Sequence, residues 1–562
     1  MAGVRLAIEG CGHGTLDAIY ASVAQSCKAR GWNAVDALII GGDFQAVRNA
    51  VDLNVMSVPQ KYRQLGDFHA YYSGTRKAPY LTIFIGGNHE ASSHLLELYY
   101  GGWVAPNIYY LGAANVLRLG PIRIAALSGI CKGNDYHKPH HERLPFSYRD
   151  VKSAYHVREL DVRKLLQIRS QVDIGLSHDW PRGIEKHGDS AKLFKNKPFF
   201  KSESRNGTLG SPAAEMIMNR LRPPYWFSAH LHTKFAAIKT YDDTGASGET
   251  TEAIASAEQQ ANPDEIDLDS NDEGKSEADK DKTHDDAAVD DEYQGETSGV
   301  ETNQVSEELR AQLPASFARP TAEATTTPGQ PVPSEITNKQ VRFLALDKCL
   351  PKRQFLQLCE VMPFSTEELS RYPPGKGTSR YNLEYDAEWL SIVRTFHKDL
   401  VIGDAEARVP QDAGEAHYRG LIEAERAWVQ QNIVAKDKLR VPVNFERTAA
   451  PHVRGNAQNV SVSDQPYEYT NPQTAAFCEL VGIENLWDAS QEERETRRQM
   501  AVQLTEPWGG GGGGGGGGGR SGGRGRGRGG RGGGRGGGRG RWGDGGGGRG
   551  RGGRGERGGG GS

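Results

Sequence analysis

Short runs of apolar residues, each ending in glycine or a polar residue, dominate the first third of the chain. Such runs are typical of buried strands. Between the first two runs, Leu16, Ile19 and Val23 recur at helical spacing, which predicts a strand, loop, helix, strand unit. The pattern therefore predicts an α/β layered domain with functional side chains on the loops that follow the strands. The predicted strands are 4–8, 37–40, 81–85, 122–127 and 174–177.

Two further strand-like runs, 234–240 and 341–346, are separated by a long polar stretch. The segment 241–340 has few large apolar side chains, so it cannot bury enough surface to offset the entropy lost on ordering. We expect a disordered acidic insertion between two strands that would otherwise be neighbours. A linker at a domain boundary is the alternative, and neither costs the fold much, because loop-closure entropy grows slowly with length.

Beyond residue 350 the apolar spacing becomes helical. The segments 416–434 and 491–504 have this pattern, so we expect a completing strand plus a mostly helical C-terminal region over 341–507. A further apolar stripe at helical spacing is typical of core packing rather than of a cofactor site. It consists of Tyr385, Trp389, Ile392, Val393, Phe396 and Leu400.

The charge distribution divides the chain again. The formal net charge of −3 is the sum of oppositely charged segments. Residues 241–310 are acidic, with 23 acidic against four basic residues, and residues 509–562 are basic, with 12 Arg and 37 Gly. The remainder is mildly basic, which permits an anionic partner without requiring one. We expect no fold for the RGG-rich tail, 508–562, which is either a spacer or a tether for RNA or protein. The acidic insertion either competes with RNA for basic surface or keeps the chain soluble.

The cysteines are scattered and include no Cys-x-x-Cys pair, which indicates neither a disulfide framework nor a cysteine-rich zinc knuckle. A reducing compartment fits this usage. No stretch approaches the ~18 consecutive apolar residues that a membrane-spanning helix needs. We expect a soluble protein that is neither secreted nor membrane-bound.

Five polar clusters each follow an apolar run, and each supplies nitrogen, oxygen or sulfur donors. One such cluster is weak evidence, because a lone histidine is usually a core or surface residue. Seven donor-bearing residues in motif order are a poor coincidence. The clusters are EGCGH (9–13), GGD (41–43), GGNHE (86–90), SHD (177–179) and AHLH (229–232).

These donors suit adjacent divalent cations. If residues 230–232 continue as a strand, His230 and His232 face the same side. Asp43 can bridge two cations, Asn88 offers a carbonyl oxygen, and imidazoles suit zinc, iron or manganese. Two cations ~3.5–4 Å apart would activate a water and stabilise the attacking and leaving oxygens in a phosphoester displacement.

The order of the clusters resembles the calcineurin-like metallophosphoesterase superfamily, whose motifs are Asp-x-His, Gly-Asp, Gly-Asn-His-Glu or Asp, a lone His and Gly-His-x-His. The resemblance implies a four-layered α/β sandwich. Two departures are Cys11 in place of the first Asp and Ala229 in place of the Gly. A thiolate at Cys11 favours zinc or ferrous iron over magnesium. Packing as a small hydrophobe is the other interpretation of this cysteine.

Longer runs, together with the Cys substitution, resemble the RNA lariat debranching enzymes. The resemblance covers 1–240 and resumes over about 341–360. The runs are GDFQAVRN (42–49), KYRQLGDFHAYYSG (61–74), GGNHEASSHLLELYYGGWVAPNIYYLG (86–112), SAYHVRELDV (153–162), LSHDWP (176–181) and FLALDKCLPKRQFLQ (343–357).

This resemblance implies a metal-dependent RNA phosphodiesterase with its catalytic domain in 1–240 and a lariat debranching C-terminal domain in 341–507. The implied reaction is hydrolysis of the 2′-5′ phosphodiester at the branch point of excised intron lariats during mRNA processing, which implies a nuclear protein. His89 is the implied catalytic residue, because an imidazolium beside the leaving 2′-oxygen can donate a proton. The cofactor would be Fe(II), Zn or Mn. The implied metal ligands are Cys11, His13, Asp43, Asn88, His178, His230 and His232.

A loop from Ser128 to Arg158 corresponds to the segment that recognises branched RNA in that family. Rings can stack on bases while cationic groups contact phosphates. Without the resemblance, an ordinary solvated loop would be the preferred interpretation. The loop contains Lys132, Tyr136, His137, His140, His141, Arg143, Tyr148, Arg149, Tyr155 and His156.

Two other function classes compete with this interpretation. A protein phosphatase is disfavoured, because GDFQAVR (42–48) lacks the Asp-Arg-Gly that follows Gly-Asp in those enzymes. An RNA-binding scaffold that has lost its chemistry is disfavoured by the intact donors at Asp43, Asn88 and His89.

Overall fold

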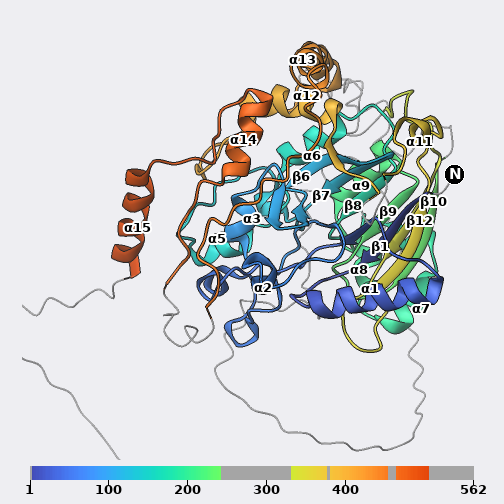
Figure 1. Ribbon diagram of the computed structural model, residues 1–562, viewed down its shortest axis with the longest axis horizontal. Coiled ribbons are helices and arrows are strands. Elements are labelled where there is room, and N and C mark those ends of the chain that lie inside the picture. The colour runs from blue at the N-terminus through green and yellow to red at the C-terminus, as the bar shows by residue number, and fades with distance from the viewer. Residues whose placement is uncertain (1–2, 242–330, 376–379, 454–463, 506–562) are drawn as a thin grey trace, which may run out of the picture. The chain divides into compact units, whose positions relative to one another are not determined.

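The computed structural model describes residues 3–241, 331–375, 380–453 and 464–505 (Figure 1). The expected disorder of the acidic insertion and of the RGG-rich tail falls on residues outside these ranges, apart from 241 and 331–340. There the expectation is wrong, because Ile336 is buried and the Tyr241 N–H donates to the Lys339 carbonyl. Within the described ranges, no helix is both long and apolar enough to cross a membrane.

The first sheet has six strands in the order β12-β1-β2-β3-β5-β4. Its interior pairs β1-β2, β2-β3 and β3-β5 are parallel, and its edge strands pair antiparallel. The bounds are β1 (Val4–Glu9), β2 (Ala37–Ile40), β3 (Thr82–Phe84), β4 (Gly102–Ala105), β5 (Ile108–Tyr110) and β12 (Leu356–Val361).

The second sheet has seven strands in the order β10-β11-β9-β8-β7-β6-β13. β10 and β11, which flank the long polar stretch, pair antiparallel from Phe235 with Ala345 to Thr240 with Gln340. The prediction that these two strands are neighbours is therefore confirmed. The bounds are β6 (Ala114–Leu119), β7 (Ile122–Leu127), β8 (Ile174–Ser177), β9 (Tyr225–Ser228), β10 (Phe235–Thr240), β11 (Gln340–Ala345) and β13 (Leu383–Tyr385).

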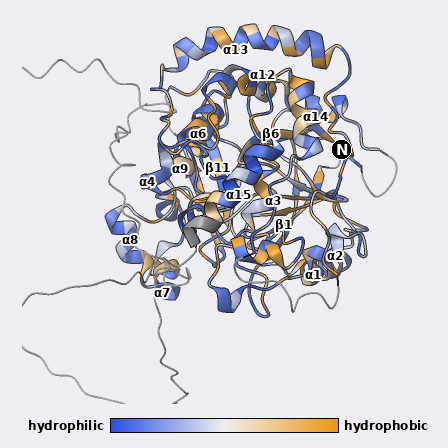
Figure 2. Cartoon of the chain, turned by 90° about the vertical axis from the view of Figure 1, so that its left-hand side faces the viewer, coloured by the Kyte–Doolittle hydropathy of each residue, from blue (hydrophilic) through white to orange (hydrophobic). Residues whose placement is uncertain are grey.

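Helices cover the sheets and form much of the C-terminal region. Hydrophilic residues line the outer helices, as α13 shows in Figure 2. The helices are α1 (Leu16–Arg30), α2 (Phe68–Tyr72), α3 (Ser92–Leu96), α4 (Gly133–Tyr136), α5 (Tyr148–Ser153), α6 (Glu159–Leu166), α7 (Ser190–Asn196), α8 (Phe200–Asn206), α9 (Pro212–Leu221), α11 (Glu367–Arg371), α12 (Ala387–Phe396), α13 (Glu415–Val429), α14 (Pro472–Val481) and α15 (Gln491–Thr505). Short 3-10 turns are η1 (Val51–Val55), η2 (Gln60–Tyr62), η3 (Ile184–His187) and η6 (His397–Asp399), and η7 (Gln430–Val434) is a π-helix.

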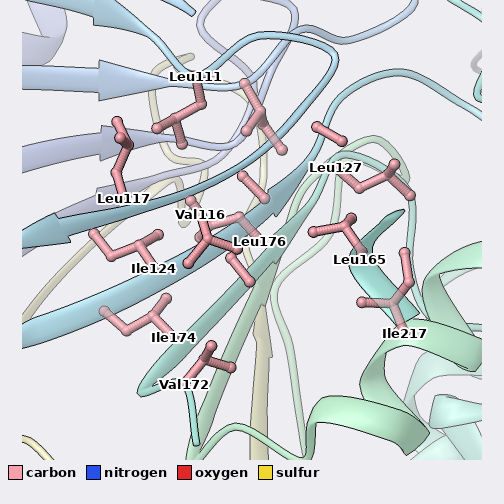
Figure 3. Packing of buried hydrophobic residues seen from close by; sticks show 14 of the residues in the cluster. Leu111, Val116, Leu117, Ile124, Leu127, Leu165, Val172, Ile174, Leu176 and Ile217 are labelled. Atoms are coloured by element: carbon pink, nitrogen blue, oxygen red, sulfur yellow. The ribbon is translucent and has the colours of Figure 1, made fainter. Parts of the chain in front are cut away.

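The layers follow from the alternation of side chains along the buried strands. In β2, Ile39 joins the cluster between the sheets, whereas Leu38 and Ile40 join the cluster beneath α1. Side chains of α6 and α9, such as Leu165 and Ile217, pack on the other face of the second sheet (Figure 3). The order helix, sheet, sheet, helix is the four-layered arrangement expected from the sequence.

The C-terminal region differs from its prediction in one respect. Its spacing predicts one strand, but three occur, because β12 pairs with β1 and β13 pairs with β6. Tyr385 of the predicted helical stripe lies in β13. The next residue, Asp386, caps α12 by accepting the Trp389 amide N–H at 3.1 Å, so the helix begins only after the strand has ended.

Buried ion pairs tie distant segments together. The Arg48 guanidinium donates to Asp52 at 2.9 Å and to Glu97 at 2.6 Å, and all three side chains are buried. Thr448, from the C-terminal region, donates its hydroxyl to Glu97 at 2.7 Å. The loop that follows Asp43 is thereby anchored to the C-terminal region.

Candidate metal centre

The five polar clusters converge at one edge of the two sheets. The loops that carry them follow β1, β2, β3, β8 and β9, whose carboxyl ends lie together because these strands run parallel within each sheet. Backbone hydrogen bonds join the loops directly: the Gly12 N–H donates to the Gly42 carbonyl, and the His13 N–H donates to the Asp43 carbonyl.

One donor set comprises Cys11, His13, Asp43 and His232, with one ligand atom of each within 4.8 Å of the others. The Nε2 atoms of His13 and His232 are 3.2 Å apart, and His13 Nε2 lies 3.6 Å from Asp43 Oδ2. The His230 N–H donates to the Cys11 sulfur at 3.2 Å, which orients the thiol.

A second donor set shares Asp43. His178 Nε2 lies 3.4 Å from Asp43 Oδ1 and 3.2 Å from Asn88 Oδ1. The other nitrogen of His178, Nδ1, donates to the Gly41 carbonyl at 2.8 Å, so Nδ1 carries the proton and Nε2 faces Asp43 and Asn88 with its lone pair. The ring centroid of His230 is 5.0 Å from that of His178. The structure thus brings all seven predicted ligands together around Asp43.

Two glycines permit this close approach. A Cβ on Gly42 would lie 2.1 Å from His178 Nδ1, and Gly42 has a φ of +122°. A Cβ on Gly87 would lie 2.2 Å from Asp43 Oδ1. Side chains at either position would push the donors apart, so the Gly-Asp and Gly-Gly-Asn motifs are steric requirements of the site.

The sequence left open whether a strand continues through His230 and His232, and the structure shows that it does not. β9 ends at Ser228, and these two histidines have φ values of 58° and 48°, in the left-handed region. His13 and Asp43 share this unusual backbone, with φ values of 39° and 47°. Turns rather than strand alternation aim these side chains, and such strained residues cluster at functional sites.

Ala229 occupies the position at which the superfamily has glycine. Its Cβ would be 3.0 Å from a Cβ on Gly41, so the methyl group fits because Gly41 has no side chain. The Ala229 carbonyl accepts the Trp180 indole N–H at 3.0 Å, which fixes the turn that follows β9. The departure from the motif is thus accommodated locally.

Burial and neighbouring charges set the protonation of the donors. Burial lowers the pKa of His13 to about 4 and that of His232 to about 2, so both rings are neutral at pH 7. Burial opposes ionisation of Asp43, but His178, His89 and His13 hold its pKa far below the usual range. Burial, and then the charges of Asp43 and Glu9, raise the pKa of the Cys11 thiol.

A divalent cation fits this donor set. Asp43 Oδ2 is enclosed and accepts no hydrogen bond from the described residues, and a buried carboxylate oxygen without a partner is costly. A cation would satisfy that oxygen and would favour the thiolate at Cys11. One sulfur, two imidazole nitrogens and one carboxylate oxygen suit zinc or ferrous iron.

His89 is held beside the donors in a defined tautomer. Its Nδ1 lies 3.0 Å from the Ser57 carbonyl, which can only accept, so Nδ1 carries the proton. Its Nε2 then accepts from the Asn88 amide at 3.2 Å. The His89 backbone N–H donates to Asp43 Oδ1 at 2.9 Å, which couples the histidine to the bridging carboxylate.

Glu90 is a site residue whose role the sequence did not indicate, although it closes the GGNHE cluster. Its carboxylate accepts the backbone N–H groups of Phe44, Gln45 and Gly87 at 2.8–3.0 Å. It therefore fixes the loops that carry Asp43 and Asn88 relative to each other. Burial, reinforced by Asp43, raises the pKa of Glu90 to about 7.

The predicted recognition loop, Ser128 to Arg158, is a packed segment that includes α4 and α5. Tyr136 and His140 are buried and cannot stack on a base in this conformation. His140 instead contacts Asp161 at 2.7 Å, and the same carboxylate pairs with Lys164 and accepts from Tyr99. The exposed members of the predicted set include His137, Tyr148 and Arg149, and they remain candidates for substrate contact.

The C-terminal region holds this loop from outside. Glu468, which is buried, accepts the Leu144 N–H at 3.2 Å and pairs with Arg497 at 2.7 Å. Arg497 also donates to the Leu144 carbonyl at 2.7 Å, and Gln465 exchanges two hydrogen bonds of 2.6 Å with the backbone of Phe146. A segment far along the chain therefore sets the shape of 143–146.

Comparison with known proteins agrees with this architecture. A sequence model of the calcineurin-like phosphoesterase family matches residues 4–234, and one of the lariat debranching enzyme C-terminal domain matches 338–486. The lariat debranching enzyme of Schizosaccharomyces pombe is 41% identical over 483 residues, which is 85% of this chain and 96% of that protein. The human enzyme of the same name is 38% identical over 88% of this chain and 71% of its own length, and the Drosophila melanogaster enzyme is 38% identical over 86% and 78%. With both halves of the fold matched and the donor set in place, the chain belongs to the lariat debranching enzyme family.

Proposed function

We propose that this protein hydrolyses the 2′-5′ phosphodiester at the branch point of excised intron lariat RNA and so linearises introns for turnover during mRNA processing. The observation that carries the proposal is the convergence of Cys11, His13, Asp43 and His232 within 4.8 Å, in a chain whose relatives are named lariat debranching enzymes. A thiol in a metallophosphoesterase donor set is the feature that separates this group from enzymes that have a carboxylate there.

The ligands divide into two sets around Asp43. Cys11, His13 and His232 complete the first set with Asp43, and Asn88, His178 and His230 complete the second. When bound, Fe(II), Zn or Mn would supply Lewis-acid stabilisation of the charge that develops on the phosphoryl oxygens. The sulfur ligand favours Fe(II) or Zn among these.

His89 is the proposed proton donor to the leaving 2′-oxygen. Its Nδ1–H is fixed by the Ser57 carbonyl, so the ring cannot turn away without losing that bond. Nε2 accepts from the Asn88 amide at 3.2 Å in the neutral ring, so protonation of Nε2 would replace that hydrogen bond with an N–H that can donate to the leaving oxygen. An alkoxide is a poor leaving group, and proton transfer to it is worth about 10²–10⁴-fold in rate.

The remaining expectations follow from this substrate. Exposed loop residues such as Tyr148 and Arg149 would contact the branched RNA, with the ring stacking on a base and the guanidinium meeting a phosphate. The RGG-rich tail would bind RNA or protein as a tether. Excised introns arise in the nucleus, so we propose a nuclear protein.

The test compares three substrates. Purified protein is incubated anaerobically with a branched RNA, a linear 3′-5′ RNA or a phosphopeptide, each with Fe(II), Zn or Mn. Cleavage confined to the branch supports the proposal. Phosphopeptide turnover would favour a protein phosphatase, and binding of branched RNA without cleavage under any metal would favour a scaffold.

A further inference from the structure

The crossover between β8 and β9 has a strongly basic outer surface. It comprises η3, α7 and α8, which pack against one another, and we call it the α7–α8 basic surface. Figure 2 shows α7 and α8 side by side with hydrophilic residues on both. Its cationic residues are Lys186, Lys192, Lys195, Lys197, Lys201 and Arg205, and all except the half-buried Lys197 are exposed.

The acidic residues of this segment do not neutralise that surface. Glu185 is 2% exposed and accepts the Ser204 hydroxyl, and Glu203 is 9% exposed. Asp189 caps α7 by accepting the backbone N–H of Lys192 at 3.0 Å and is exposed, so one exposed carboxylate stands against five exposed cations. In the described parts of the chain, no ion pair involves the ammonium or guanidinium groups of the five exposed residues, so their charge faces solvent.

An exposed aromatic ring lies among the lysines of the α7–α8 basic surface. Phe199, between Lys197 and Lys201 in sequence, is 64% exposed at the start of α8. Strand β10 lies beside this segment, because Gly188 forms a β-bridge with Ala237, and Lys239 of the same strand adds a further positive charge. Burial lowers the pKa of the neighbouring His187, and Lys239 and Lys186 lower it further. Exposed lysines around an exposed ring are the combination that binds single-stranded RNA without sequence preference.

The surface is within reach of the catalytic site. The segment that joins β8 to β9 begins directly after His178 of the candidate metal centre. Lys186 is eight residues further along, so its backbone lies at most about 29 Å from that of His178. A strand of RNA that leaves the branch point could therefore contact both.

We infer that the α7–α8 basic surface binds the phosphate backbone of the intron outside its branch point, with Phe199 stacking on a base. This inference rests on the proposed function for the identity of the RNA. The surface supplies affinity for long substrates and takes no part in the chemistry. RNA is favoured over a protein partner because the side chains that define this surface are dispersed exposed cations around the exposed ring of Phe199.

The test neutralises three exposed lysines: Lys192→Ala, Lys195→Ala and Lys201→Ala together. Binding of a long linear RNA, which is no debranching substrate, is measured by fluorescence anisotropy over a range of salt. We expect at least tenfold weaker binding at low salt and a decrease of about 2 in the slope of log K against log salt, at about 0.7 per lost phosphate contact. Phe199→Ala should weaken binding about fivefold or more with an unchanged slope.

The matched control carries Lys28→Ala, Lys398→Ala and Lys436→Ala, which are exposed on other elements and should leave both quantities unchanged. Cleavage of a branched RNA with very short arms should have the wild-type kcat and KM in the triple variant, whereas KM for long arms should rise. Equal RNA affinity and salt slope in the triple variant and the wild type would overturn the inference.

Two further results separate the alternatives. Carbodiimide cross-linking of these lysines to residues 241–310 in the full chain, with RNA affinity unaffected by the triple substitution, would assign the surface to the acidic insertion and refute RNA binding. A wild-type protein that cleaves no branched RNA would refute the proposed function, while the linear-RNA affinities would still decide for or against the surface.

Discussion

Gly87→Ala is the substitution that tests the geometry of the metal centre most directly. The new Cβ would lie 2.2 Å from Asp43 Oδ1, 2.4 Å from the Asp43 backbone nitrogen and 2.7 Å from His178 Cε1. Ordinary contact begins at 3.4 Å, and two of these neighbours cannot rotate away, because one is backbone and the other belongs to a ring held by the Gly41 carbonyl. Asp43 and the 86–90 loop must therefore separate.

The magnitude follows from that displacement. Relieving a 2.2 Å contact moves Asp43 by about 1 Å, and a misplacement of that size costs about 10²-fold in catalysis. Overpacking of this kind costs about 1–3 kcal/mol in the free energy of unfolding, so the protein should remain folded. We expect kcat/KM for branched RNA to fall by about 100-fold, with weaker binding of Zn or Mn by titration calorimetry.

The adjacent glycine provides the control. A Cβ on Gly86 would meet Leu95 Cδ1 at 3.5 Å, Ser128 Cβ at 3.6 Å and the Tyr110 hydroxyl at 3.6 Å, which are ordinary contacts. Gly86→Ala should therefore keep cleavage within about threefold of the wild type, since the new methyl group makes only ordinary van der Waals contacts although the position is buried. Similar kinetics and metal affinity in the two variants would refute the steric argument.

Four further predictions use other parts of the molecule. Cys11→Ala should lower the metal content measured by elemental analysis together with branched-RNA turnover; unchanged values would show that the thiol only packs. Glu468→Gln should raise KM for branched RNA roughly tenfold, because the charge-assisted hydrogen bond that Glu468 accepts from Leu144 of the predicted recognition loop is worth about 1.5–3 kcal/mol. Hydrolysis of bis(p-nitrophenyl) phosphate should be unchanged, and a parallel loss of both activities would contradict a positioning role. Arg48→Met should lower the free energy of unfolding in urea by about 3–5 kcal/mol, because it leaves the buried carboxylates of Asp52 and Glu97 without their cation. Arg76→Met removes the cation of a half-exposed pair with Asp17 and should cost less than about 1 kcal/mol; equal costs would refute the distinction. Neighbouring cations hold the pKa of Asp161 below its usual range despite its burial, so ionised Asp161 stabilises the fold above its unfolded-state pKa of about 3.9, and this stabilisation is lost as the pH falls. Asp161→Asn should therefore make the free energy of unfolding less dependent on pH between about 5 and 2. An unchanged pH dependence would refute this linkage.

Seven of the thirteen strands in the described ranges, and the donors of the metal centre, could be predicted from the sequence. The runs 37–40, 122–127 and 174–177 are strands over their full predicted lengths, because a buried parallel strand needs a continuous apolar run and ends where turn residues begin. Asp43, Asn88 and His178 were likewise identified because short motifs fix them to the ends of such strands. Apolar runs and short motifs involve residues close together in sequence, so they can be recognised without knowledge of the fold.

Other features depended on contacts between distant segments. The strands β12 and β13 exist because β1 and β6 offer edges for pairing, which no local period encodes. Tyr136 and His140 resemble exposed stacking residues in sequence but are buried by their surroundings.

The backbone at His230 and His232 also departs from the strand geometry that their spacing favours. The chain forms turns there instead of a strand, held by the hydrogen bonds from the His230 N–H to the Cys11 sulfur and from the Trp180 indole N–H to the Ala229 carbonyl. The sequence by itself determined which residue types follow which strands, because hydrophobic periodicity and glycine placement act over a few residues. Only the tertiary structure decided which side chains meet and which charges face solvent, because burial and pairing depend on parts of the chain hundreds of residues apart.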